Sequence, residues 1–216
     1  MENIINIDYF VGELTIPNLN KDEGDNFETT YINRYQKDYL IKVLGYSMFK
    51  DFETALSEET PDVKWTNLLN GVDYDVIIDG ETVLTKWNGF TNNDNVSPIA
   101  YYVYRAWINK NYAQLTGTGV GVSNKENASN YPLNFKSVSA QNNEIDLTGN
   151  LRKYLYSNTY KYIKRYKNSK YYREDLTFVD DSVKLDQSLF MYLYHHRDDF
   201  TNWIFTNETK QNVFGI

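Results

Sequence analysis

The spacing of apolar residues changes its period once along this chain, and that change limits the fold more than any other sequence feature. Most apolar residues recur every three or four positions, which places them on one face of a helix. In residues 72–78 they recur at every second position, as in a strand. Asp79-Gly80 then favours a two-residue hairpin turn, because both positions accept positive φ. The sequence predicts a mainly α fold with one β-hairpin over residues 72–87.

Apolar stripes at helical spacing predict the other regular elements. Gly45 and Asn70-Gly71 stand where a helix would stop, and Ser47 is placed to cap the helix after Gly45. A break is indicated around residues 147–149, and residues 171–184 are expected to be a connector. The predicted helices cover residues 27–46, 47–56, 61–69, 98–113, 138–170 and 185–204.

Three further segments are predicted to lack regular structure. Residues 1–26 form an extended arm, which is too apolar to be a free tail and is expected to dock on its own domain or on a neighbouring copy. Residues 116–132 are rich in Gly, Ser and Asn and form a loop, and loops of this length tend to be functional. Residues 207–216 form a short C-terminal tail. The central unit would span residues 27–206.

Composition excludes several classes of protein. Cysteine is absent, which removes disulfides, thiolate metal sites and cysteine nucleophiles. The only histidines are His195 and His196. No apolar run approaches the roughly 20 residues that a membrane helix needs, and the N-terminus shows no basic region followed by an apolar stretch, so no secretory signal is expected.

Charge is divided unevenly between the two halves. Residues 1–100 carry 7 basic and 18 acidic side chains, whereas residues 101–216 carry 15 basic and 11 acidic ones. The net charge of -7 argues against general coating of nucleic acid. The 20 tyrosines are large contact residues with a polar end. These features favour a protein that works by contact, without catalysis and without a cofactor.

Two motifs resemble catalytic or ligand sites but lack the required context. Gly117–Gly121 is preceded by a predicted helix and lacks the spacing of a phosphate-binding loop, so a flexible loop is favoured. His195 and Asp199 are four residues apart and could share a helix face, but a metal site would need further ligands from elsewhere. His196 lies on an apolar stripe and is expected to be half-buried.

Carboxylates line the predicted hairpin. Asp73, Asp75, Asp79 and Glu81 could bind calcium or act as an acid–base pair. A hydrolase that uses Asp73 and Asp75 with the histidine pair is a separate alternative. The favoured interpretation is the solvated face of an amphipathic hairpin, which could also touch a partner.

A basic, tyrosine-rich stretch covers residues 151–175. Three interpretations remain open: a protein interface, a solvated face, or nucleic-acid contact through phosphate charge and base stacking. The acidic half of a second copy would be a complementary surface, and head-to-tail contacts between copies close into rings. The residues expected at a subunit or partner interface are Tyr101, Tyr104, Trp107, Arg152, Tyr154, Lys161, Lys164, Arg165 and Tyr166.

Several segments in order resemble a known family. They are Trp65–Gly71 before the hairpin, Lys86–Phe90 after it, the tyrosine-rich Pro98–Tyr104, Gln114–Val120 and Asn124–Ala128. Together they are similar to neck proteins of tailed phages that infect gut Bacteroidetes, the crAss-like phages and their relatives. The resemblance covers roughly residues 27–170.

This resemblance implies a virion structural role. Such chains look like mainly helical head–tail connectors, in rings of about twelve copies beneath the portal. The portal and the adjacent neck or tail ring protein would be its partners, and packaged DNA would pass through the channel without specific binding. The chain would be found in the virion neck, after assembly in the host cytoplasm, with no membrane partner. The C-terminal segment 207–216 is expected to dock on the portal or on the phage tail through Val213, Phe214 and Ile216.

The acidic half, or a mixed surface, is expected to face the channel, since strong phosphate binding would hinder DNA passage. The alternative function is a DNA-binding accessory protein that uses residues 151–173.

Overall fold

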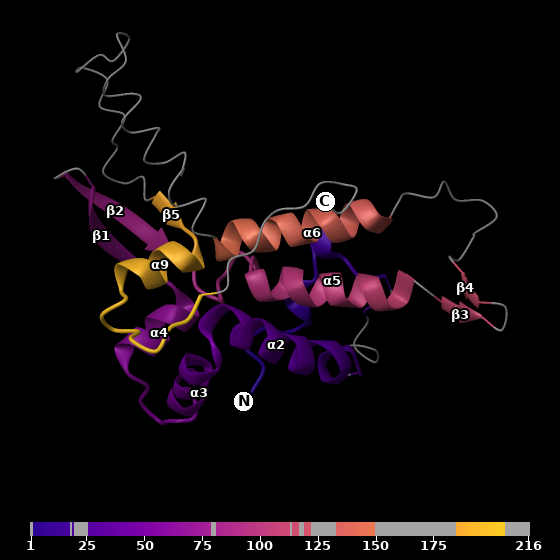
Figure 1. Ribbon diagram of the computed structural model, residues 1–216, viewed down its shortest axis with the longest axis horizontal. Coiled ribbons are helices and arrows are strands. Elements are labelled where there is room, and N and C mark those ends of the chain that lie inside the picture. The colour runs from indigo at the N-terminus through magenta and orange to yellow at the C-terminus, as the bar shows by residue number, and fades with distance from the viewer. Residues whose placement is uncertain are drawn as a thin grey trace, which may run out of the picture.

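The fold is mainly α, as the sequence predicts. The computed structural model describes residues 2–17, 19, 26–78, 81–112, 114–116, 119–121, 133–149 and 185–205. Three helices lie side by side, with α5 (Pro98–Tyr112) between α2 (Asn33–Leu44) and α6 (Leu133–Thr148) (Figure 1). The shorter α3 (Tyr46–Ala55) and α4 (Val63–Asn70) follow α2. No helix in the described part of the chain is long and apolar enough to cross a membrane.

Local sequence signals explain most helix ends. Gly45 has φ of 78° and ends α2, where the sequence predicts a stop. The prediction that Ser47 caps α3 is wrong, because α3 begins at Tyr46 and Gly45 occupies the cap position. The next helix, α4, begins later than residue 61 because the Asp62 carboxylate accepts a hydrogen bond from the Lys64 amide at 3.1 Å.

Among the described residues, the last two helices differ from their predicted bounds. The helix predicted over residues 138–170 begins earlier, at Leu133, and α6 ends before Gly149, whose φ is 79°, at the indicated break. The rest of that prediction and the predicted connector 171–184 lie outside the described part of the chain. The prediction of a single helix over residues 185–204 is wrong. Leu185–Gln187 forms strand β5, and Ser188 then caps α9 (Leu189–His195) by accepting from the Met191 amide at 3.4 Å.

The hairpin is present as predicted, and it belongs to a larger sheet. Strands β1 (Val72–Ile78) and β2 (Glu81–Trp87) are antiparallel, and β5 pairs in parallel with the end of β2. The strand order is β1-β2-β5. A second small hairpin, β3 (Gln114–Thr116) with β4 (Gly119–Gly121), stands at the other end of the molecule (Figure 1). It corrects the start of the predicted loop 116–132, whose residues 122–132 lie outside the described part.

The N-terminal residues pack on the same chain. Two short 3₁₀ turns, η1 (Ile7–Tyr9) and η2 (Gly12–Leu14), cross the helices, and a π-helical turn, η3 (Glu28–Ile32), leads into α2. The buried Gln36 amide holds the first of these residues: its Oε1 accepts from the amides of Ile4 at 2.7 Å and Ile5 at 3.3 Å. The apolar residues that follow join the main core; they are Ile5, Tyr9, Phe10, Leu14 and Ile16.

One buried carboxylate joins the three long helices. Glu144 on α6 is 1% exposed, and its oxygens lie 3.0 Å from Lys42 Nζ on α2 and 3.3 Å from Arg105 Nη2 on α5. Both cations also lie over the Tyr102 ring, at 4.9 and 5.1 Å from its centroid. A buried charge is costly unless it is paired. This cluster therefore favours the one position of α6 against α2 and α5 that brings the three charges together.

Two glycines meet at the base of the hairpin. Gly71 has φ of 86° and Gly89 has φ of 82°. A β-carbon on Gly71 would lie 2.5 Å from the Trp87 carbonyl oxygen, and one on Gly89 would lie 2.5 Å from the Asn70 carbonyl carbon. The turn after α4 and the turn after β2 therefore approach backbone to backbone, which no larger residue permits.

We expect Gly71→Ala and Gly89→Ala each to lower the free energy of unfolding by more than about 2 kcal/mol, because positive φ and a backbone clash add. Gly12→Ala is the matched control: its φ is also positive, at 59°, but nothing lies within 4 Å of its added β-carbon. It should cost only about 1 kcal/mol. Urea unfolding measures all three, and equal losses would contradict the backbone contact.

We expect Glu144→Ala to lower the free energy of unfolding by about 3 kcal/mol, because the neighbouring cations lose their buried counter-ion. The control is Glu53→Ala, which removes the partner of the exposed Lys50 on α3 from an ion pair at the surface and should leave stability nearly unchanged. Chemical denaturation of both variants tests this, and similar losses would show that the buried cluster contributes no more than a surface pair.

Candidate functional site

The predicted interface tyrosines of α5 are internal residues of this chain. Tyr101 is 8% exposed and Tyr104 is 2% exposed. The Tyr101 hydroxyl donates to the Glu13 carboxylate, which also accepts from Asn143 Nδ2 at 3.2 Å. Burial, and then the neighbouring Glu13 carboxylate, raise the pKa of Tyr101. These tyrosines thus hold η2 and α6 against α5, and they offer little surface to a partner.

The third predicted residue on α5 is more accessible. Trp107 is half-buried, and its ring stacks on Tyr104 with 6.0 Å between the ring centroids. A cavity of about 490 Å³ lies nearby, between η2, α5 and α6, and it is lined in part by Phe135, which is 43% exposed. The other predicted interface and docking residues lie outside the described part of the chain; they are Arg152, Tyr154, Lys161, Lys164, Arg165, Tyr166, Val213, Phe214 and Ile216.

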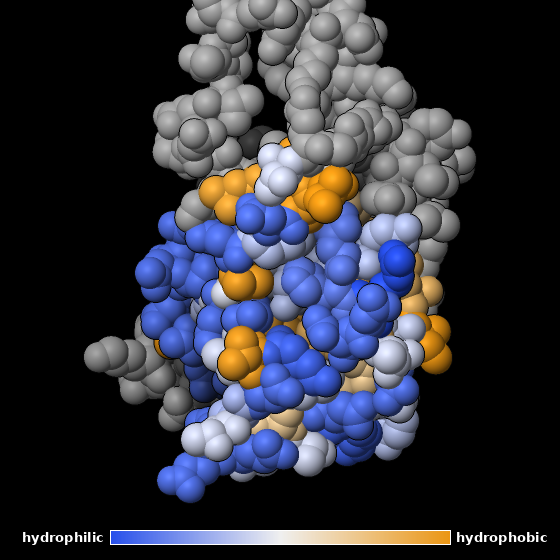
Figure 2. Space-filling view, turned by 90° about the vertical axis from the view of Figure 1, so that its left-hand side faces the viewer, coloured by the Kyte–Doolittle hydropathy of each residue, from blue (hydrophilic) through white to orange (hydrophobic). Residues whose placement is uncertain are grey.

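The two faces of the β1–β2 hairpin have different surroundings. Tyr74 points to the inner face, where its ring meets Tyr192 of α9 at a centroid distance of 5.6 Å. Alternate residues of a strand point to opposite faces, so Asp73, Asp75 and Ile77 belong to the outer face, and all three are exposed. The end of the molecule that carries the hairpin is mainly hydrophilic, with hydrophobic residues gathered near its upper margin (Figure 2). The hairpin therefore projects an outer face that is both acidic and apolar.

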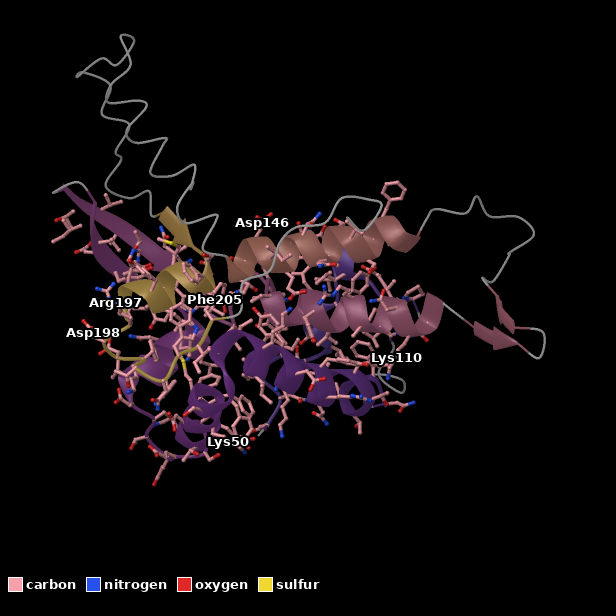
Figure 3. All side chains as sticks on the ribbon, viewed as in Figure 1. Lys50, Lys110, Asp146, Arg197, Asp198 and Phe205 are labelled. Atoms are coloured by element: carbon pink, nitrogen blue, oxygen red, sulfur yellow. The ribbon has the colours of Figure 1, made fainter. Side chains whose placement is uncertain are left out.

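The histidine pair lies on the other side of the same hairpin. The Tyr74 hydroxyl is 3.3 Å from His195 Nδ1. His196 Nδ1 lies 2.9 Å from the Tyr192 carbonyl oxygen, which can only accept, so this nitrogen carries the proton. Arg197 and Asp198 follow in the exposed turn after α9 (Figure 3). The alternative of a hydrolase site that combines the histidines with Asp73 and Asp75 is wrong. The histidines lie at the inner face of strand β1, whereas the two carboxylates lie on its outer face.

The remaining motifs are only partly described by the structure. Among the described residues, no group of three or more His, Asp or Glu side chains is placed to hold a metal ion. Asp79 and the side chain of Glu81 lie outside the described part, as do Gly117 and Thr118 of the glycine-rich motif. Gly119–Gly121 forms β4, which pairs with β3 in the small hairpin.

A polar groove at the hairpin base was missed by the sequence interpretation. Its volume is about 680 Å³, and it runs between the outer face and the turn after β2. Asn92 shapes one wall by bonding the Val96 amide at 3.1 Å and the Val96 carbonyl at 2.6 Å. The repeated Asn-Gly pairs and the run Asn92–Asn95 were the available signal. The main polar lining residues are Asn70, Asp73, Lys86, Asn88, Asn92 and Asp94.

We expect acid to destabilise the contact between α9 and the hairpin. Burial, followed by the charges of His196 and Arg197, lowers the pKa of His195 to about 4, below its ordinary value of about 6.5. The unfolded chain therefore binds this proton more readily, so the stabilising contribution is complete above pH 6.5 and is lost as pH falls toward 4.

The measurement is the free energy of unfolding between pH 7 and 4.5 for the natural chain and for His195→Gln. The variant should show a shallower loss with falling pH, since the carboxylates that also titrate are common to both. Parallel curves would contradict the assignment of this pH dependence to His195.

No family model, curated protein or solved structure matches the chain. Of the surfaces described above, the projecting hairpin with the groove at its base is the one whose position, charge and exposed apolar residue best fit a contact with another macromolecule.

Proposed function

We propose that this chain is a structural virion protein, a head–tail connector that forms a ring beneath the portal and docks the next component of the tail. The proposal follows the resemblance of residues 27–170 to phage neck proteins. The observation that supports it most directly is the hairpin, which projects from a helical body and keeps an exposed outer face (Figure 1). A projecting element of this kind suits contact with a neighbouring subunit.

The way in which the hairpin is held also supports a contact role. The opposed Gly71 and Gly89 fix its base, and Tyr192 of α9 stacks on Trp87 at a centroid distance of 5.9 Å. A contact element that is already ordered loses less conformational entropy when it binds. The hairpin thus presents its outer face in one orientation, which a symmetric ring requires of every subunit.

Charge is consistent with a channel role. The acidic residues of the N-terminal half include the exposed Asp73 and Asp75 of the outer face and the exposed Glu58 and Glu59 between α3 and α4. A negative surface lets DNA pass because it forms no phosphate contacts. We propose that acidic or mixed surfaces of this half face the channel, and that Val213, Phe214 and Ile216 dock on the portal or tail.

The test is the number of copies of this chain in purified virions, measured by quantitative mass spectrometry against the major capsid protein. A ring predicts about a dozen copies per particle. Hundreds of copies would overturn the proposal in favour of a capsid or tail-tube component. Absence from the particle, together with salt-sensitive duplex binding that is lost on neutralising Lys161, Lys164 and Arg165, would favour the DNA-binding alternative.

A further inference from the structure

A basic and aromatic patch lies beside the last turn of α5, at the end of the molecule opposite the hairpin (Figure 1 and Figure 3). Lys110 Nζ lies 5.6 Å from the centroid of the Tyr31 ring and 5.5 Å from that of the Tyr35 ring. The Arg34 guanidinium lies over the same Tyr35 ring, also at 5.5 Å. Both cations are exposed and both tyrosines are half-buried. These four residues, from η3, α2 and α5, form the α2–α5 patch.

Aromatic rings hold the cations of this patch in place. Neither Arg34 nor Lys110 forms an ion pair with another described residue. Tyr31 and Tyr35 stack with 23° between their ring planes, and Asn111 Nδ2 donates to the Tyr31 hydroxyl at 3.0 Å. A cation over an aromatic face is positioned without being neutralised. The patch therefore keeps two positive charges that can attract an acidic partner.

The outer face of the hairpin offers a complementary surface. Beyond its base this face carries the exposed Asp75 and Ile77, and Ile77 is 76% exposed. In the strand register Asp75 lies opposite Leu84, whereas the basic Lys86 lies opposite Asp73 near the base. Residues directly opposite one another share a face. The part of the outer face away from the base therefore combines a carboxylate with apolar side chains.

Charge and position favour a second copy of this chain as the occupant of the patch. Contact between two hairpin outer faces would bring like charges together, which is unfavourable. Duplex DNA is disfavoured because two cations neutralise few phosphates and the chain has a net charge of -7. The patch and the hairpin lie at opposite ends of one molecule (Figure 1). A contact from one to the other can therefore repeat from copy to copy.

We propose that the outer face of the hairpin of one copy docks on the α2–α5 patch of the next copy. Asp75 then faces Arg34 and Lys110, and Ile77 packs on the tyrosine rings. A contact of this kind is heterologous and can close into a ring. The inference rests on the proposed function, since it names the surfaces through which neighbouring subunits of the connector meet. It leaves the acidic turn between α3 and α4 to face the channel.

The test measures self-association of the full chain by sedimentation equilibrium at low ionic strength, with two variants that each reverse one charge. Lys110→Glu changes the patch, and Asp75→Lys changes the hairpin. We expect each variant alone to self-associate about tenfold more weakly than the natural chain, because each loses one side of the charged contact. We also expect the association of the natural chain to weaken as salt rises.

Mixing the two variants tests whether these two surfaces meet each other. A one-to-one mixture brings the natural Asp75 of one variant against the natural Lys110 of the other. A heterodimer should therefore form with the affinity of the natural contact, within about twofold, although neither variant self-associates well. Two charges that act at unrelated contacts would give no such recovery.

Matched variants separate this contact from general charge effects. Lys136→Glu on α6 repeats the charge change of Lys110→Glu at another exposed lysine, and Glu58→Lys repeats that of Asp75→Lys. Each control should change self-association by less than about twofold. Ile77→Thr tests the apolar contact with no change of charge, and it should also weaken self-association. Unchanged circular dichroism shows that each variant remains folded.

Three results would overturn the inference: no self-association of the natural chain up to about 1 mM, equal weakening by the variants and their matched controls, or no heterodimer in the mixture. Loss of duplex binding in Lys110→Glu with unchanged self-association would overturn it in favour of a nucleic-acid surface. The copy number in the virion is measured separately. A ring-like copy number without the heterodimer would leave the connector role standing and remove only this contact. A heterodimer from a chain that is absent from virions would establish the contact and remove the connector role.

Discussion

The packing of the three long helices depends on the buried Glu144 carboxylate. A charge in this position costs several kcal/mol to remove from water, on the order of what one ion pair returns. Here two cations from two different helices approach it, Lys42 from α2 and Arg105 from α5, and both also contact Tyr102. Sliding α6 along its neighbours by one turn would separate these charges. The cluster therefore restricts α6 to one position, and with it the position of Gly149, which lies against Ser188 at the start of α9.

Helix α9, which begins next to Gly149, connects the three long helices to the hairpin. Helix α9 lies under the inner face through Tyr192, and Gly71 and Gly89 lock the base of β1 and β2 to the end of α4. The segments Trp65–Gly71 and Lys86–Phe90 are thus the two sides of this joint. Their arrangement accounts for a rigid, projecting hairpin, and a rigid projection is what the proposed connector would use to meet a neighbouring subunit.

The sequence interpretation found the elements of the candidate site but not their relations. Strand periodicity and Asp79-Gly80 were enough to predict the hairpin and to place Asp73 and Asp75 on one face. Tyr101 and Tyr104 were expected at an interface because the chain is rich in tyrosine. Composition gives the number of tyrosines, but it does not show which side of α5 faces the core. The polar groove at the hairpin base joins residues from both Asn-Gly turns and the following loop, and no local pattern brings them together.

The sequence by itself determined the mainly α class, the hairpin and the helix stops at Gly45, Gly71 and Gly149, because periodicity and positive-φ glycines act over a few residues. Only the tertiary structure decided that Leu185–Gln187 is a strand and that it pairs with β2. Three residues have too little intrinsic preference to choose a strand over a helix turn. Their hydrogen bonds to β2, about a hundred positions earlier in the chain, make that choice.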